Sequence, residues 1–127
     1  MTENEIATII VDRAFHIHRD LGPGLFETVY ERILEVELTK RGLTVVRQKP
    51  IPIVYHGVLF EAGFRCDLLV ENKVIVEVKS IETLHPVHRK QVLTYLRFAD
   101  KRLGLLINFN VALIKDGIVR LVNGLKE

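Results

Sequence analysis

The segment FRCDLLVENKVIVEVKS, residues 64–80, decides the fold. Two runs of apolar and β-branched residues flank the polar stretch Glu71–Lys73, which is typical of two antiparallel strands joined by a tight turn. On the second strand Glu77 and Lys79 are two residues apart, so both share one face with Ile75. Charged side chains are rarely buried unless they are paired or bind a metal. An acid and a base at these positions therefore indicate either a functional site or an ion pair.

The length of the turn decides whether Asp67 joins this pair. Cross-strand neighbours lie on the same face, so Asp67 lies beside Glu77 only if the two residues are opposite each other. That register leaves a three-residue turn, in which Asn72 is the non-glycine residue best suited to a left-handed conformation. A two-residue turn would instead pair Asp67 with Val78. We expect the three-residue turn.

Two carboxylates about 5 Å apart at their Cβ atoms can share one hard divalent cation such as Mg²⁺. Lys79 beside them could hold and help deprotonate a water, or offset negative charge in a transition state. The same three positions also fit a surface salt bridge between Glu77 and Lys79. The spacing alone leaves both interpretations open.

The chain before this segment is helical and then changes to short strands. Apolar residues at spacings of three and four predict a helix over about 4–20 and a second over about 26–41. The second has Val29, Ile33 and Val36 along its apolar stripe. β-Branched segments separated by proline, glycine or polar turns predict five strands, at 43–48, 51–55, 58–60, 65–70 and 74–78. Prolines at 50 and 52 place the first of them at a sheet edge.

The chain after this segment predicts one further helix and two strands. Pro86 opens a helix that runs to about Ala99. The apolar run 103–108 is typical of a buried strand, and a last strand follows at 118–122. The order predicts an α/β or α+β fold, with helices packed on a mixed β-sheet.

Composition favours a single globular domain over residues 1–127. The chain has 48% hydrophobic and 27% charged residues, the ordinary mixture of a soluble protein. Its longest apolar runs are far shorter than the roughly 18 residues of a membrane span, and the N-terminal residues are acidic where a signal peptide is basic. The single cysteine, Cys66, cannot form an internal disulfide. We expect a cytoplasmic protein with no membrane partner, and Cys66 as a core thiol on the face opposite Asp67.

Positive charge collects in the C-terminal third of the chain. Residues 81–127 carry eight bases and four acids, whereas residues 1–42 carry five bases and eight acids. A run of bases is commonly a solvated helix face, but it is also typical of a surface that binds phosphates. On the helix over 86–99, Arg89 and Lys90 are the candidates for contact with a nucleic-acid backbone.

The same helix carries a polar stripe. His88, Gln91 and Tyr95 are spaced at i, i+3 and i+7 and therefore lie on one side. Gln91 could donate to a phosphate, and Tyr95 could stack on a base. A partly buried contact between the two residues is the structural alternative. His16 and His18 end the first helix, where a cation suits the helix dipole, although His18 also adjoins the glycine-rich turn before Glu27.

Three motifs taken together resemble one family. They are Gly24-Leu25-Phe26-Glu27-Thr28-Val29-Tyr30, then Asp67 followed by Glu77-Val78-Lys79, and lastly Gln91 with Tyr95. In this order they resemble the PD-(D/E)xK nuclease superfamily, and more closely its group of GxxExxY proteins. Cys66 stands where the superfamily's name has a proline. The resemblance runs from about residue 6 to residue 122.

This resemblance implies a restriction-endonuclease-like core in the order α-α-β-β-β-α-β. It also implies a bound Mg²⁺ or Mn²⁺ held by Asp67, Glu77 and the Val78 carbonyl, with Lys79 as the catalytic lysine. Glu27 corresponds to the additional acid that many members bring to the metal. A solvated acidic start of the helix is the alternative for Glu27, because Glu31 lies one turn further on.

We therefore expect a Mg²⁺-dependent nuclease that hydrolyses DNA phosphodiester bonds and leaves 5′-phosphate and 3′-hydroxyl ends. The alternatives are a nucleic-acid-binding or regulatory protein that keeps the fold without turnover, and an interaction subunit. Two carboxylates facing a phosphate favour the enzyme, since a pure binding module would avoid their repulsion of DNA. Specificity is expected to come from a second copy of the chain or from another protein.

Overall fold

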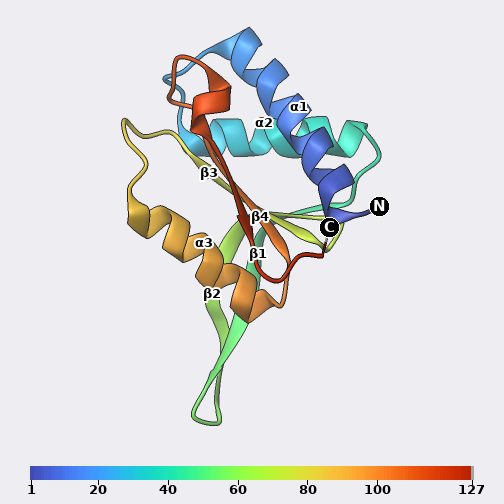
Figure 1. The fold of residues 1–127 in the computed structure, drawn as a ribbon, viewed down its shortest axis with the longest axis vertical. Coiled ribbons are helices and arrows are strands. Elements are labelled where there is room, and N and C mark those ends of the chain that lie inside the picture. The colour runs from blue at the N-terminus through green and yellow to red at the C-terminus, as the bar shows by residue number, and fades with distance from the viewer. Residues whose placement is uncertain (127) are drawn as a thin grey trace.

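A computed structural model describes residues 1–126, which form helices on both sides of one five-stranded sheet (Figure 1). In chain order the elements are α1 (Glu3–Leu21), α2 (Glu27–Lys40), β1 (Val45–Tyr55), β2 (Val58–Val70), β3 (Val74–Lys79), α3 (Pro86–Ala99), β4 (Leu103–Asn108), the 3₁₀ helix η1 (Ile114–Gly117) and β5 (Ile118–Val122). None of the helices in the described part is long and apolar enough to cross a membrane.

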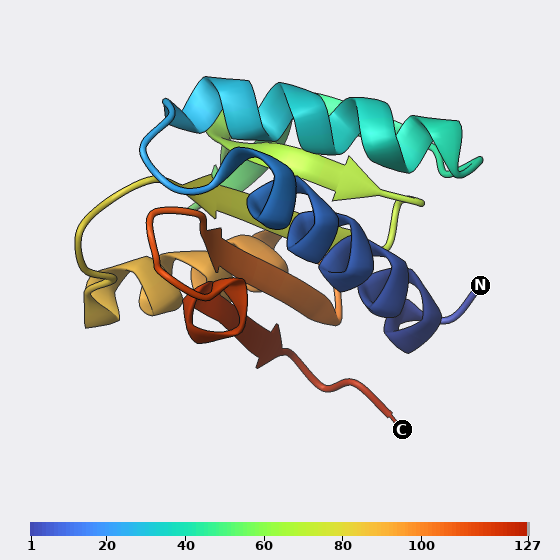
Figure 2. The same cartoon turned by 90° about the horizontal axis from the view of Figure 1, so that it is seen from above.

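The sheet has the strand order β1-β2-β3-β4-β5 and is mixed. Strands β3 and β4 are parallel and are connected through α3, while all other neighbours are antiparallel. Helices α1 and α2 cover one face and α3 covers the other (Figure 2). The expected fold class is confirmed: a mixed α+β architecture in the predicted order, consistent with a restriction-endonuclease-like fold.

Each face of the sheet has its own apolar core. On one face, Ile75 packs with Val92 and Leu96 of α3. The other face packs against α1 and α2 and includes the alternate valines of β3, which are Val74, Val76 and Val78. Strand β4 is buried along its whole length, as the apolar run predicted. Strand β3 is therefore fixed from both sides, which gives its polar end a rigid position.

The predicted register between β2 and β3 is confirmed. Leu68 lies opposite Val76 and Val70 opposite Val74, which leaves a three-residue turn over 71–73. Glu71 and Asn72 both adopt a left-handed conformation with φ of 53°. Continuing this register by one residue places Asp67 opposite Glu77.

The five strand segments predicted before β4 are too many, because the first four join into two long strands. Segments 43–48 and 51–55 form β1, and segments 58–60 and 65–70 form β2. Pro50 and Pro52 do not end β1, since it is the edge strand and one side of it needs no donors. The register shifts at Pro52, between Ile51 and Ile53. Beyond this bulge the hairpin projects from the body (Figure 1).

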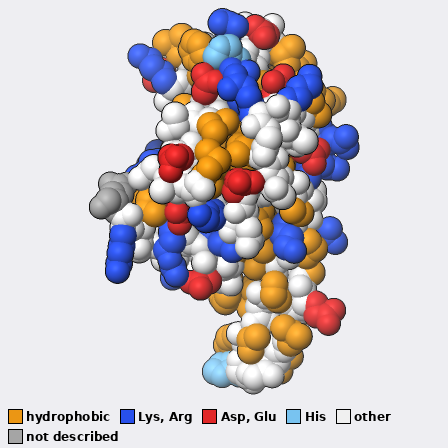
Figure 3. Space-filling view, turned by 90° about the vertical axis from the view of Figure 1, so that its right-hand side faces the viewer, with side chains coloured by type: hydrophobic (Ala, Val, Ile, Leu, Met, Phe, Trp, Pro, Cys, Tyr) orange, Lys and Arg blue, Asp and Glu red, His pale blue; other side chains and the backbone are white. Residues whose placement is uncertain are grey.

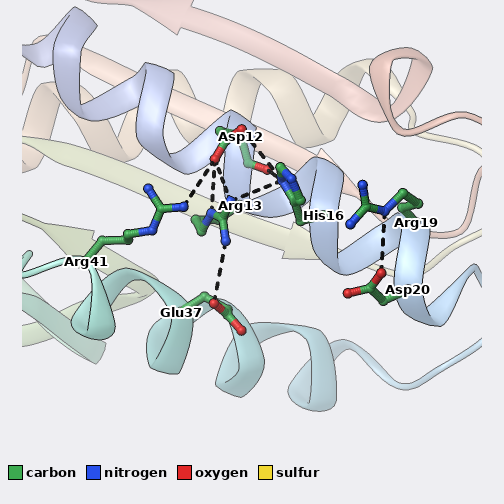
Figure 4. A network of polar contacts seen from close by, with 7 residues as sticks. All are labelled: Asp12, Arg13, His16, Arg19, Asp20, Glu37 and Arg41. Carbon is green, nitrogen blue, oxygen red and sulfur yellow. Dashed lines mark hydrogen bonds and ion pairs between the residues drawn. The ribbon is translucent and has the colours of Figure 1, made fainter.

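The predicted apolar stripe of α2 is wrong. Val29 and Val36 are exposed, and the buried stripe is Tyr30, Leu34 and Leu38. Beside this buried stripe, Glu37 of α2 faces a network of polar groups on α1 (Figure 4). Arg13 of α1 lies 3.8 Å from the Glu37 carboxylate in this network.

Candidate nuclease site

The regular hydrogen bonding between β2 and β3 ends at Leu68 and Val76, and side chains replace the backbone there. The Val78 N–H donates to Oδ2 of Asp67 at 2.8 Å, and the Asp67 N–H donates to Oε2 of Glu77 at 2.9 Å. Each carboxylate thus accepts a bond that a strand carbonyl would otherwise accept. The two acids adjoin where the strands separate.

The strict alternation of faces predicted for β2 fails at this point. Cys66 and Leu69 both pack on the α3 side with Ile75, although they are three residues apart, while Leu68 packs on the other side. Opposite this irregularity Gln48 has a φ of 53°. Cys66 therefore lies on the same side of the sheet as Ile75 and Glu77, and not opposite them. Its role as a core thiol is confirmed, because it is fully buried and burial raises its pKa to about 12.

Glu77 is the most strongly perturbed acid of this site. It is 5% exposed, and burial, followed by the neighbouring Asp67 carboxylate, raises its pKa to about 9. The positive charge of Lys79 opposes this rise in pKa. Among residues 1–126 the ion pairs within 4.0 Å do not include one between Glu77 and Lys79. The salt-bridge interpretation of these two residues is therefore wrong.

Glu31 of α2 belongs to the same cluster, and the sequence analysis missed it. Its carboxylate accepts from Nη1 of Arg47 and from Nε2 of Gln48, both at 2.8 Å, and Nε2 of Gln48 also lies 3.3 Å from Oδ1 of Asp67. Glu31 is 3% exposed, and burial raises its pKa against the effect of Arg47. A signal was present, since Glu31 falls on the true apolar stripe of α2, three residues before Leu34.

Glu27 lies at the end of β3 rather than in this cluster. Its Oε2 accepts from the N–H of Ser80 at 3.4 Å, and Oγ of Ser80 donates to the Leu25 carbonyl at 2.6 Å. Tyr30 is fully buried and its hydroxyl donates to the Gly22 carbonyl at 2.6 Å. The motif from Gly24 to Tyr30 thus fixes the loop before α2 onto the strand that carries Glu77 and Lys79. Glu27 is half-buried and is not part of a solvated helix start.

Helix α3 brings one of its three stripe residues close to the carboxylates. The ring of Tyr95 stacks on Phe64 with 3.9 Å between ring centroids. Its pKa is raised by burial and then by the charges of Glu77 and Asp67, while a hydrogen bond with Gln91 lowers it. Gln91 itself is exposed.

The remaining candidates on α3 lie at its outer surface. His88 accepts from the N–H of His85 at 2.9 Å through Nδ1 and so caps the start of the helix. Arg89 and Lys90 follow it and are exposed. The exposed side chains of Arg89 and Lys90 can contact an anionic ligand. His88, in contrast, already accepts a hydrogen bond from His85 through Nδ1.

Asn108, at the end of β4, is a second residue that the sequence analysis missed. It is buried opposite Lys79, and its side chain bonds both the N–H and the carbonyl of Ile81. The loop that follows β3 is thereby held in place. The signal in the sequence was a single amide at the end of an otherwise apolar run.

His18 is structural in this arrangement. Its Nε2 lies 2.7 Å from the carbonyl of Val111 and joins the end of α1 to the loop after β4. His16 bonds the carbonyl of Asp12 within α1.

Residues 4–121 match the family model described as the PD-(D/E)XK nuclease superfamily. The chain belongs to the PD-(D/E)XK nuclease superfamily. Comparison with curated proteins and with solved structures gives no significant match. The matched range includes Asp67 and the run Glu77-Val78-Lys79, which meet at the strand break described above.

PD-(D/E)XK nucleases typically use divalent metals. Residues 1–126 contain no group of three or more His, Cys, Asp or Glu side chains arranged to hold a metal ion. Mg²⁺ is commonly bound by one or two carboxylates together with waters and substrate phosphates. Asp67 and Glu77 are adjoining oxygen donors of this kind, and burial, followed by the charge of Asp67, raises the pKa of Glu77. The donor set therefore fits a hard divalent cation.

Proposed function

We propose that this superfamily member is a Mg²⁺-dependent deoxyribonuclease and belongs to the GxxExxY group. The observation that carries the proposal is the pair Asp67 and Glu77, which adjoin at a strand break with Lys79 two residues further on. Two adjoining carboxylates do not stabilise a fold by themselves, because like charges that are close together and shielded from water repel each other. The same two carboxylates favour the binding of a cation, and a bound cation in turn favours the binding of a phosphate.

In this proposal Asp67, Glu77 and the Val78 carbonyl hold Mg²⁺ or Mn²⁺, with Glu27 as an additional acid beside the end of β3. The bound cation would supply positive charge to the scissile phosphate and to the attacking water. The fixed hydrogen bonds of Asp67 and Glu77 hold both carboxylates in place before a ligand arrives. Such preorganisation is a principal source of catalytic rate.

Lys79 holds the attacking water and helps to remove its proton. The water oxygen forms a bond to phosphorus as the bond from phosphorus to O3′ breaks, and O3′ takes up a proton. The products are a 5′-phosphate and a 3′-hydroxyl. Once the neutral amine of Lys79 has taken the proton from the water, the resulting ammonium offsets the negative charge on the phosphate oxygens, and O3′ takes its proton from solvent.

Helix α3 supplies the contacts to the substrate. Gln91 bonds a phosphate or its water, and Tyr95 extends the wall of the site through its stack on Phe64. Arg89, Lys90 and His88 contact the DNA backbone, where basic side chains supply affinity that depends on salt.

Cleavage of single-stranded, duplex and branched DNA and of RNA, with Mg²⁺ and with EDTA, tests the proposal. We expect metal-dependent cleavage of DNA, and a loss of 10² or more in rate for Glu77→Ala and for Lys79→Ala. The control is Glu61→Ala, because Glu61 is an exposed acid on the distal part of β2 and should cleave as wild type.

Two outcomes would contradict the proposal. Equal cleavage by wild type and Glu77→Ala, after removal of contaminating nucleases, would refute the assignment of the site. Binding of DNA without any cleavage would favour the alternative, a regulatory or nucleic-acid-binding protein that retains the fold.

A further inference from the structure

The distal part of the β1–β2 hairpin exposes apolar side chains. We call residues 51–64 the arm. Tyr55 is 62% exposed and Phe60 is 52% exposed. Three further apolar residues of the arm are more than half exposed, and these are Val54, Val58 and Leu59. The arm projects from the body, and its surface is mostly apolar in the view that faces it (Figures 1 and 3).

The pairing within the arm collects four of its apolar residues on one side. Ile53 lies opposite Phe60, and Tyr55 lies opposite Val58. Cross-strand partners share a face, and residues two apart on a strand share it as well. We call this set of four residues the arm face. A two-stranded hairpin is marginally stable in water on its own, so an uncovered apolar face needs a partner.

The charge of the arm argues against a nucleic acid as that partner, although the exposed bases Lys49 and Arg65 lie just outside it. Between residues 51 and 64 the only charged residue is Glu61, an acid. Surfaces that bind DNA or anionic lipid carry clustered Lys and Arg, and the candidate bases of this chain lie on α3 instead. The arm therefore fits an apolar protein surface.

We infer that the arm face packs against the arm face of a second copy of this chain. The exposed parts of the four arm-face side chains offer on the order of 350 Å² per arm, taking about 200 Å² for a fully exposed aromatic side chain as the guide. Two copies that meet through this face would then bury roughly 700 Å², which is the size of a weak, reversible interface. Closed two-fold association is the commonest way in which soluble proteins form oligomers.

Self-association also fits the side chains of the arm face. All four are apolar, so a two-fold axis through this face brings no like charges together. The aromatic rings of Tyr55 and Phe60 are of the type that dominates interface energetics. The inference does not depend on nuclease activity, because the arm face contains none of the residues proposed for the site.

Sedimentation equilibrium from about 1 to 100 µM tests this inference on the full chain. We expect wild type to form a dimer, and the double variant Tyr55→Ser/Phe60→Ser to raise the dimer Kd at least 100-fold. Phe15→Ser is the matched control, since Phe15 is an exposed aromatic residue on α1 at the other end of the molecule. A monomeric wild type, or a dimer that the double variant leaves intact, would overturn the inference.

A cysteine cross-link provides a test that does not depend on the serine variants. The native Cys66 is fully buried, so Val58→Cys introduces the only exposed thiol among the described residues. We expect this variant to form a disulfide-linked dimer at least tenfold faster than Asp20→Cys, which places a thiol on α1. Equal rates of cross-linking would count against contact between two arm faces.

Discussion

The two halves of β2 are unusual in opposite ways: the inner half places charged groups in the interior, and the outer half places apolar side chains at the surface. The inner half, residues 66–70, is mostly buried, yet it brings Asp67 against the buried Glu77. The outer half, residues 58–60, is exposed, yet all three of its residues are apolar. Burying charge and exposing apolar surface both cost stability. One strand therefore carries both of the features that we assign to function.

The inner half compensates for its buried charge with hydrogen bonds. Asp67 accepts from Val78 and Gln48, and Glu31 accepts from Arg47 and Gln48. Among residues 1–126 no buried side-chain oxygen or nitrogen lacks a hydrogen-bond partner. The outer half has no comparable compensation within the chain. Under the two proposals, the site is complete within one chain apart from its ligands, whereas the arm is completed by contact with a second copy.

The largest difference between the two halves is expected for leucine truncation. Leu68 is fully buried, whereas Leu59 is 57% exposed. Leu68→Ala should lower the free energy of unfolding by about 2–5 kcal/mol, because it leaves a cavity in the core. Leu59→Ala should change it by less than about 0.5 kcal/mol. Denaturant titration at a concentration low enough to keep the chain monomeric measures both, and equal losses would show that the arm is packed in the monomer.

A smaller effect is expected from the proton held by Glu77. Its pKa in the folded protein, about 9, lies above its ordinary value of 4.5. Between these two pH values the folded state binds more protons than the unfolded state, so stability falls as pH rises. We expect the Tm of the metal-free protein to fall across this range. Glu77→Gln should reduce the slope, because the amide does not titrate in this range.

Mg²⁺ should reverse this loss, since it would take the place of the proton. At tenfold excess over its Kd, Mg²⁺ stabilises the folded state by roughly 1.4 kcal/mol, which raises Tm by a few degrees. The effect should be larger at high pH than at low pH and absent in Glu77→Ala. Thermal scans with EDTA and with millimolar Mg²⁺ measure it. A metal-free Glu77→Ala that melts lower than wild type, with no Mg²⁺ response in either protein, would indicate a purely structural role.

Gln48 of β1, which lies beside the inner half of β2, allows a test of backbone geometry. This residue has a left-handed backbone, and its amide bonds both Glu31 and Asp67. Gln48→Gly suits the backbone but removes the amide, so we expect Tm to be kept while cleavage falls about fivefold. Gln48→Ala should lose both, because alanine does not favour positive φ. Equal cleavage by wild type and Gln48→Gly would show that Asp67 needs no positioning by this residue.

The sequence predicted the regular parts of the fold well. Apolar periodicity located α1 and α3, and the length of the turn over 71–73 predicted the register that brings Asp67 opposite Glu77. These features follow from local rules, which a short stretch of sequence carries by itself. The buried strand β4 was also predicted, because a fully apolar run has few other places in a soluble protein.

The errors share one physical cause, which is a dependence on distant residues. Prolines at 50 and 52 correctly indicated an edge strand, but the division into two segments there was wrong, because an edge strand tolerates prolines through its unpaired side. The irregularity near Asp67 depends on Gln48, which lies 19 positions away in the sequence. Glu31 was missed because the buried side of α2 is set by contact with the sheet. Such pairings are fixed by tertiary structure and leave only weak local signals.

The smallest effect concerns α3, the helix that packs over the inner half of β2. If Arg89 and Lys90 contact the DNA backbone, each neutralises about one phosphate, and the plot of log affinity against log salt becomes less steep by about one unit for each alanine variant. Between 50 and 200 mM salt, one unit of slope corresponds to about a fourfold change in affinity. Binding is best measured in a Lys79→Ala background, so that the DNA remains intact.

Lys40→Ala is the matched control, because Lys40 is an exposed base at the end of α2, on the opposite side of the sheet. It should leave the salt dependence unchanged. If Lys40→Ala flattens the plot as much as Arg89→Ala does, the positive charge of α3 is an ordinary solvated helix face. A change confined to Arg89 and Lys90 would instead connect this helix to the two carboxylates, since Tyr95 lies on it and its pKa responds to the charges of Glu77 and Asp67. DNA would then lie across the inner half of β2, while the arm remained available to a second copy of the chain.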